Sequence, residues 1–243
     1  AAAWLALPGG VVLLALGWHV AAGRIGNRSF LPAPGTVWHS LVANRVEIWL
    51  HLQTTVAAIV GGFAIGFLLA TVLGYVLSRS DLLERLLTPY IVASQAVPVI
   101  AIAPLLVLWF GAGMPVKVVV SALVAFFPML VTTIVGLRHI DPAYRELMRA
   151  LSASRAQTLV WLEVPAALPV LLGGVRLGVT LAVIGAVVGE FLGSDRGLGT
   201  LVLIAKGSYN DRLVFAALLV LVCLAFVLYG TVAALERILL RHR

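Results

Sequence analysis

The chain has 243 residues, of which 62% are apolar and only 11% charged, and its mean hydropathy is +1.09. A soluble domain is typically about half apolar and about a quarter charged, so this composition excludes an ordinary soluble enzyme and a disordered segment. The net charge of +7 would suggest nucleic acid for a soluble domain. In so apolar a chain it is better explained by cationic loops that flank membrane helices and face lipid, so we expect no nucleic-acid partner.

The N-terminal region is expected to hold the first membrane span. A spanning helix needs about 20 mostly apolar residues, so the length allows roughly five to seven spans. The apolar run 4–21 predicts the first span rather than a signal peptide, because further spans follow it. Pro32, Pro34 and Gly35 then mark a turn. Thr36 is a suitable N-cap for an amphipathic interfacial helix that extends to about residue 50.

The second span is expected over residues 52–77. It contains four glycines, and Gly62 and Gly66 have the G-x-x-x-G spacing that lets another helix approach closely. A chance spacing in a glycine-rich helix is the alternative interpretation. The pattern favours a tight helix–helix contact at these two residues.

The third span is expected over residues 89–110, after a polar connection over residues 79–88. Pro89 would open the span, and Pro98 and Pro104 lie inside it. Interior prolines break helical hydrogen bonds and persist where neighbours or a cavity satisfy the backbone. Gln95 adds a polar group just before Pro98. These residues suggest a kinked helix that lines a translocation path, although a kink without function explains them equally well.

The remaining apolar runs predict three more spans, over residues 116–136, 166–191 and 213–235. The expected fold is therefore an all-α integral membrane bundle of six helices, forming one domain over residues 1–243 with both termini on one side. Nine arginines lie on the side of the termini, against seven Lys and Arg on the other side. This excess favours cytoplasmic termini.

Two ionisable residues lie inside predicted spans, where such residues are rare and often functional. Arg176 lies part-way along the fifth span and Glu190 near its far end. With Gln95 and Pro98 they are the candidate residues of the translocation path. Snorkelling of Arg176 and an ordinary interfacial position for Glu190 are the alternatives.

Motifs for catalysis and cofactor binding are absent from the sequence. It has no G-x-x-x-x-G-K-[ST] for ATP, and no G-x-S-x-G, H-E-x-x-H or C-x-x-C. The histidines do not share a helix face at metal-ligand spacing. We therefore expect a protein that is not an enzyme and has no catalytic residue, cofactor or metal in this chain.

The most informative segment is the charged loop over residues 137–165. Asp141 followed by Pro142 predicts a helix start, and Ser154 with Gln157 has the form of a capping box. The pattern predicts two short helices, separated by small residues at 152–154, with the second helix ending before Pro165. Such a capped pair is suited to docking a partner, although a plain connector has the same signature.

This segment resembles the EAA loop of ABC-importer permeases, whose pattern is E-A-A-x-x-x-G, nine residues, then I-x-L-P. Glu146 stands at its Glu, Ser152 at its Gly, Leu162 at its Ile and Pro165 at its Pro. The serine departs from the pattern and leaves the tightness of the turn open. Further resemblances cover most of the chain and lie at residues 31–34 (LPAP), 98–113, 173–177 (GGVRL) and 190–199 (EFLGSDRGLG).

The resemblance implies a multi-pass permease subunit of the cytoplasmic (inner) membrane that works as a pair of copies. Its partners would be ATP-binding subunits, which hold ATP and Mg, and an external solute-binding protein. Within this family, the chain resembles the branch that imports alkanesulfonates, taurine, nitrate, thiamine-precursor pyrimidines and riboflavin. The loop over residues 190–199 is most similar to that of the pyrimidine and riboflavin importers.

The resemblance also implies that residues 149–156 form a coupling helix seated in the ATP-binding subunit. The residues it assigns to this contact are Glu146, Arg149, Ala150, Ser152, Ala153, Ser154, Arg155 and Pro165. The rival hypotheses are an autonomous ion- or proton-coupled secondary transporter and an integral-membrane enzyme.

Overall fold

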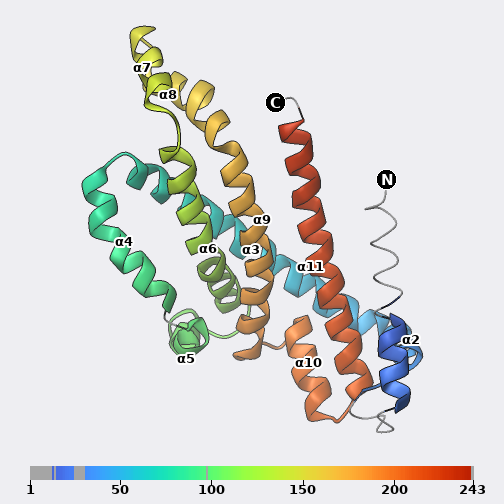
Figure 1. Cartoon of the computed structure of the whole chain (residues 1–243). Coiled ribbons are helices and arrows are strands. Elements are labelled where there is room, and N and C mark those ends of the chain that lie inside the picture. The colour runs from blue at the N-terminus through green and yellow to red at the C-terminus, as the bar shows by residue number, and fades with distance from the viewer. Residues whose placement is uncertain (1–12, 14, 25–30, 97, 242–243) are drawn as a thin grey trace.

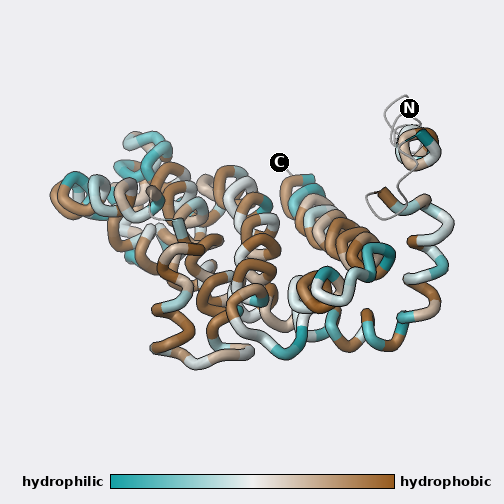
Figure 2. Tube along the Cα trace, turned by 90° about the horizontal axis from the view of Figure 1, so that it is seen from below, coloured by the Kyte–Doolittle hydropathy of each residue, from teal (hydrophilic) through white to brown (hydrophobic). Residues whose placement is uncertain are grey.

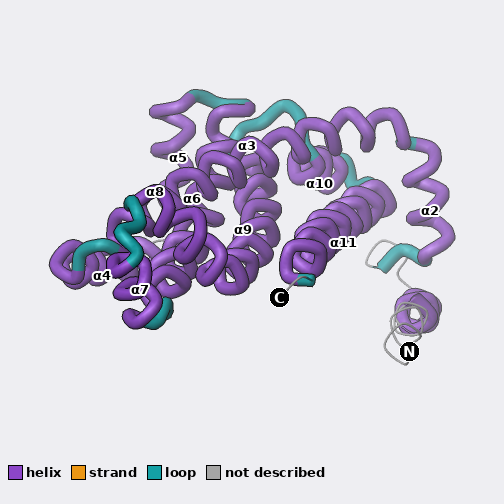
Figure 3. The backbone as a smooth tube through the Cα atoms, turned by 90° about the horizontal axis from the view of Figure 1, so that it is seen from above, coloured by secondary structure: helices purple, strands orange, loops and turns teal. Residues whose placement is uncertain are grey.

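The computed structural model describes residues 13, 15–24, 31–96 and 98–241, and within them all regular secondary structure is helical (Figures 1 and 3). The expected all-α class is therefore confirmed for this part of the chain. Most of the first expected span, 4–21, lies outside the described residues. Residues 15–24, which are described, are helical.

Four helices of the described part are long and apolar enough to cross a membrane: α3 (Arg45–Ser78), α6 (Met114–Arg138), the continuous helix Arg155–Phe191, and α11 (Asp211–Leu240). α4 (Asp81–Ala96) and α5 (Val99–Phe110) form a pair bent by 93°, which would count as a fifth span. Two shorter helices are α2 (Pro34–Ala43) and α10 (Leu198–Gly207). The long helices are hydrophobic along most of their length (Figure 2).

The centre of the bundle is α6, which packs between α3 and α9 (Val164–Phe191) (Figure 1). Glycines make both contacts close. A Cβ atom on Gly66 would lie 2.9 Å from the Ala122 carbonyl oxygen, and one on Gly189 would lie 2.7 Å from Lys117 Cα. Gly62 likewise meets Ser121. The tight contact predicted from the G-x-x-x-G spacing is thus confirmed, with α6 as the partner.

α11 packs against α10 and α2 through a separate apolar cluster. Leu198 and Leu201 from α10 are fully buried there, together with Ala216 and Ala217 from α11. This cluster attaches α10 and α2 to the same end of the bundle, opposite the end where α11 finishes (Figure 1).

The predicted interfacial helix over residues 36–50 is wrong in its extent. α2 ends at Ala43, and α3 already begins at Arg45, seven residues before the expected second span. Asn44 causes the break, since its backbone leaves the helical region while its side-chain amide donates to the Ser40 carbonyl at 2.8 Å.

The predicted start of the third span at Pro89 is also wrong. α4 begins at Asp81, and Pro89 lies inside it. The Ser80 hydroxyl accepts from the Leu83 amide at 3.3 Å, and Asp81 and Glu84 in the first turn pair with Arg138. This N-terminal stabilisation explains why a polar segment forms a helix. Pro98 caps α5 at the sharp bend.

Candidate functional site

The charged loop forms one end of the molecule, where α7 (Pro142–Ala150) and α8 (Arg155–Thr158) project beyond the long helices (Figure 1). Both predicted helix starts are confirmed. The Asp141 carboxylate accepts from the Ala143 amide at 2.9 Å. Ser154 and Gln157 make the reciprocal bonds of a capping box, at 3.2 and 2.7 Å. The backbone ends of this loop are therefore satisfied by its own side chains.

The turn between the two helices is tight. Ser152 has φ +53°, in the left-handed region where glycine is favoured. The Ala153 amide donates to the Met148 carbonyl at 3.0 Å and the Ser152 amide to the Arg149 carbonyl at 2.9 Å, which together make a Schellman motif. The position where the EAA pattern has glycine thus requires the conformation that glycine adopts, and serine adopts it here.

The structure of this loop corrects two expectations. Residues 149–156 do not form a single helix, because the left-handed Ser152 ends α7 and a new helix begins at Arg155. The second helix also does not end before Pro165. It continues through a π-helical turn, η1 (Leu159–Glu163), directly into α9, so the proline falls in the first turn of α9. Because that helix is continuous, Pro165 lies inside it, and its missing amide hydrogen interrupts the hydrogen-bond ladder just after the π-helical turn.

The predicted coupling residues divide by exposure. Glu146, Arg149, Ala150, Ser152, Ser154 and Arg155 are exposed, and Ala153 and Pro165 are half-buried. α7 buries none of its residues. Tyr144, Leu147 and Leu151 lie at helical spacing along it and are 57%, 54% and 68% exposed. An apolar stripe on an otherwise polar, projecting loop is a surface suited to a protein partner.

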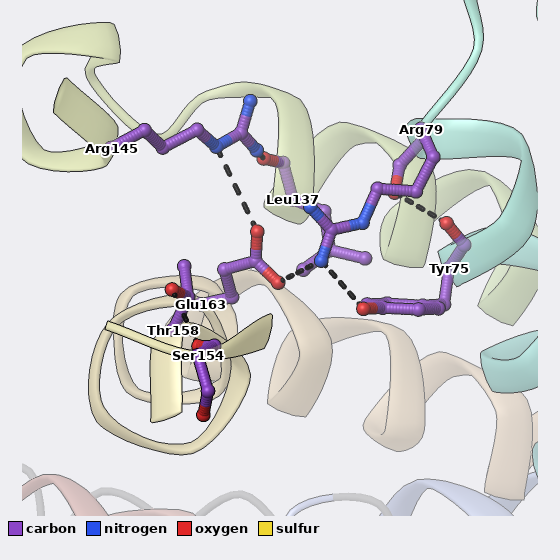
Figure 4. A network of polar contacts seen from close by, with 8 residues as sticks. Tyr75, Arg79, Leu137, Arg145, Ser154, Thr158 and Glu163 are labelled. Carbon is purple, nitrogen blue, oxygen red and sulfur yellow. Dashed lines mark hydrogen bonds and ion pairs between the residues drawn. The ribbon is translucent and has the colours of Figure 1, made fainter. Parts of the chain in front are cut away.

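A buried carboxylate lies directly behind this loop (Figure 4). Glu163, from η1, is 1% exposed, and its Oε2 accepts from Arg79 Nη2 at 2.7 Å. The Arg79 guanidinium also donates to the Tyr75 hydroxyl at 2.5 Å. From the other side, Arg145 Nε of α7 lies 3.8 Å from Glu163 Oε1, while Arg145 Nη2 donates to the Leu137 carbonyl at 2.7 Å. Glu163 therefore joins three separate elements.

The candidate path residues lie in separate environments. Gln95 and Pro98 are exposed at the bend between α4 and α5. Arg176 forms an ion pair with Glu236 of α11 and lies 5.3 Å from the centre of the Tyr229 ring. This pairing gives Arg176 a structural partner that the sequence pattern did not suggest. The residues therefore do not form one cluster within this subunit.

Glu190 is 1% exposed and lies next to the last residue of α9. Its carboxylate accepts from the Thr55 hydroxyl and the Gly199 amide, both at 2.6 Å. Three neighbours missed by sequence reasoning complete the cluster. Thr55 accepts from the Leu198 amide at 2.8 Å, His51 from the Gly197 amide at 2.9 Å, and Lys117 donates to the Arg196 carbonyl. The loop before α10 is thereby held on α3, α6 and α9.

We expect the Glu190→Gln substitution to lower stability by about 1–3 kcal/mol. Thr55 and Gly199 donate to different oxygens of the carboxylate, and an amide keeps only one acceptor oxygen. Either the Thr55 hydroxyl or the Gly199 amide would therefore face the NH₂ group of the glutamine, which is itself a donor, in a buried site. Thermal unfolding of the purified protein in detergent measures the effect. Glu47→Gln, which changes an exposed acid of α3, is the matched control. Equal midpoints for the two variants would contradict the buried cluster.

Long apolar helices in one bundle, with a capped and exposed loop at one end, define the class of polytopic membrane proteins. Residues 62–241 match the family described as the inner membrane component of binding-protein-dependent transport systems, and the chain belongs to this family. It is therefore a permease subunit of an ABC importer and not an enzyme. The family implies an ATP-binding subunit and a binding protein as partners, which sets aside the autonomous carrier.

Named relatives support the assignment. The chain is 43% identical to the riboflavin transport system permease protein RibX of Chloroflexus aurantiacus, over 98% of this chain and 90% of that protein. It is 37% identical to the formylaminopyrimidine transport permease protein ThiX of Halalkalibacterium halodurans (96% and 93% covered) and 30% identical to the taurine transport system permease protein TauC of Escherichia coli (93% and 85%).

The fold agrees with a solved transporter. A chain of the MetNI methionine ABC transporter, in an inward-facing conformation, superimposes with a TM-score of 0.69 at 20% identity, covering 79% of this chain and 96% of that chain. At this identity the likeness concerns the fold alone.

Proposed function

We propose that the turn between α7 and α8 is the contact through which the ATP-binding subunit drives this permease. The observation that carries the proposal is a doubly capped, projecting loop that exposes Tyr144, Leu147 and Leu151. The contact comprises Glu146, Arg149, Ala150, Ser152, Ala153, Ser154 and Arg155, with Pro165 fixing the base of the loop. ATP and Mg are held by the partner, so neither has a site in this chain.

Two copies of the permease form the translocation path between them, within the lipid of the cytoplasmic membrane. Gln95, Pro98, Arg176 and Glu190 are its candidate residues. Because the proposed contact faces the cytoplasm, both termini lie on the cytoplasmic side. The end of α11 at the same pole as α7 supports this orientation for the C-terminus (Figure 1). Mass measurement of the purified complex tests the pairing, and a complex with one permease copy would contradict it.

The solute proposed for the importer is riboflavin, with a formylaminopyrimidine-type thiamine precursor as the second candidate. The decline in identity from the riboflavin and formylaminopyrimidine permeases to the taurine permease, from 43% and 37% to 30%, supports this order.

The test is binding and uptake with the solute-binding protein and ATP-binding subunit that assemble with this chain. Calorimetry on the solute-binding protein with riboflavin, formylaminopyrimidine and taurine identifies the ligand. Uptake of the same compounds into proteoliposomes that hold the whole complex and ATP confirms transport. Binding and uptake of riboflavin are expected. Binding of taurine alone would overturn the proposed solute without affecting the proposed coupling contact.

A further inference from the structure

Among the residues labelled in Figure 4, Glu163 is the one that pairs both with the projecting loop and with the end of α3, and its own helix continues into α9. It lies in η1, the π-helical turn that joins α8 to α9. Its partners come from the C-terminal end of α3 (Arg79) and from α7 (Arg145). A carboxylate buried to 1% exposure is costly unless it is paired, so its two arginines hold these elements together.

The two halves of the carboxylate differ. Oε2 makes a short charge-assisted hydrogen bond with Arg79 at 2.7 Å. Oε1 faces Arg145 Nε at 3.8 Å, which is too long for a hydrogen bond. Both of these atoms are buried, and neither makes a hydrogen bond with any described residue. An approach of about 1 Å would complete the second bond at its usual length.

The base of α9 is not closely packed on every side. A cleft of about 290 Å³ adjoins the π-helical turn and is lined by residues of α3, α6, η1 and α9, among them Tyr75, Leu137, Leu159 and Val164. π-helical turns occur frequently at functional sites, because the extra residue can shift along the helix. The base of α9 is thus held by one ion pair, faces a second that is incomplete, and borders an open apolar cleft.

We propose that Glu163 is the positioning residue through which movement of the α7 loop reaches the membrane helices. When the loop is displaced, the Arg145–Glu163 pair closes into a hydrogen bond and η1 moves with α7, which tilts the base of α9. Arg79 keeps the Glu163 carboxylate at the C-terminal end of α3. This inference rests on the proposed docking of the ATP-binding subunit on the same loop.

The experiment measures the movement by paired spin labels in the full complex of permease and ATP-binding subunits in nanodiscs. Labels at Ala143 in α7 and at Val160 in η1 are each paired with Ile238 in α11, all of them exposed positions, in a Cys223→Ser background. Distances are compared without nucleotide and after trapping with ATP, Mg and vanadate. In the unsubstituted complex, both pairs are expected to shift on trapping.

In Glu163→Gln, which keeps the side-chain shape but removes its charge, the Ala143 pair is expected to shift while the shift of the Val160 pair is lost. Arg145→Gln is expected to give the same loss of the Val160 shift. The double variant with Glu163→Gln is expected to lose no more of it than either single variant. Glu84→Gln is the matched control, because it also removes one carboxylate charge from an ion pair near the same end, with Arg138 at 2.6 Å. It is expected to keep both shifts.

The outcomes are distinguishable. A retained Val160 shift in Glu163→Gln overturns the inference, because a merely structural carboxylate would change stability without separating the two movements. Absence of both shifts in the unsubstituted complex, or failure of the ATP-binding subunit to copurify with it, overturns the proposed docking instead. Copurification of the Glu163→Gln complex at the usual yield shows that its folding is intact.

Discussion

Replacing Ala153 with glutamate is expected to abolish most ATP hydrolysis stimulated by loaded binding protein, while membrane insertion persists. Ala153 contributes to the turn through its backbone amide, which donates to Met148, so the substitution leaves the Schellman motif intact. A bulky anion at the tip of the loop would instead be forced against the ATP-binding subunit. The three arginines and one glutamate of residues 142–158 indicate an acidic partner surface.

A penalty of 1.4 kcal/mol at this contact corresponds to about a tenfold weaker interaction, and an unpaired buried charge costs more than that. The measurement is stimulated ATPase activity of the reconstituted complex, with permease content quantified in the same vesicles. Ala143→Glu is the control, since Ala143 is exposed in the first turn of α7, where an acid suits the helix dipole. Full stimulated activity in Ala153→Glu would refute the proposed contact.

Apolar runs locate helices well when the helix ends are also marked in the sequence. α6 and α11 cover the expected ranges 116–136 and 213–235 with a few residues added at each end. The capping residues Asp141 and Ser154 likewise specify their own helix starts by local hydrogen bonds. Such features depend on neighbours within one turn, so they can be read from a single sequence.

Features that depend on distant residues were missed. The start of α4 at Asp81 depends only partly on such a contact: the Ser80 cap and the first-turn acids are local signals, but the pairing of those acids with Arg138, more than fifty residues away, is not. Glu163 is separated from Arg79 by 84 residues, and no local pattern identifies that partner. One available signal was that Glu163 is the only acid between Glu146 and Glu190, in an apolar setting, where a carboxylate requires a cation.

The same distinction applies to the candidate site. The charged stretch over residues 137–165 located the exposed loop, and its two helix starts could be predicted from their capping residues. The extent of the coupling segment could not, because the left-handed Ser152 and the π-helical continuation into α9 depend on backbone conformation rather than on residue type. The cluster around Glu190 combines α3, α6, α9 and a loop, which no spacing along the chain reveals.

Replacing Gly185 with leucine is expected to destabilise the bundle strongly. A Cβ atom at Gly185 would lie 2.7 Å from Ser121 Cα and 2.9 Å from the Val120 carbonyl oxygen, both of which are backbone atoms of α6. No rotamer change can relieve such a contact, so α6 and α9 would have to separate. The bond from the Ser121 hydroxyl to the Ala182 carbonyl, 2.9 Å long, would be lost with them.

The effect extends to the third helix, because Ser121 is fully buried where α3, α6 and α9 meet and Gly62 of α3 also packs on it. We therefore expect a loss of about 3 kcal/mol or more, at the upper end for overpacked cores. Size-exclusion chromatography and thermal unfolding in detergent measure it. Gly173→Leu is the matched control, because Gly173 lies on the same helix and a Cβ atom there would meet nothing within 4 Å. Equal stability of the two variants would mean that α9 does not pack on α6 at Gly185.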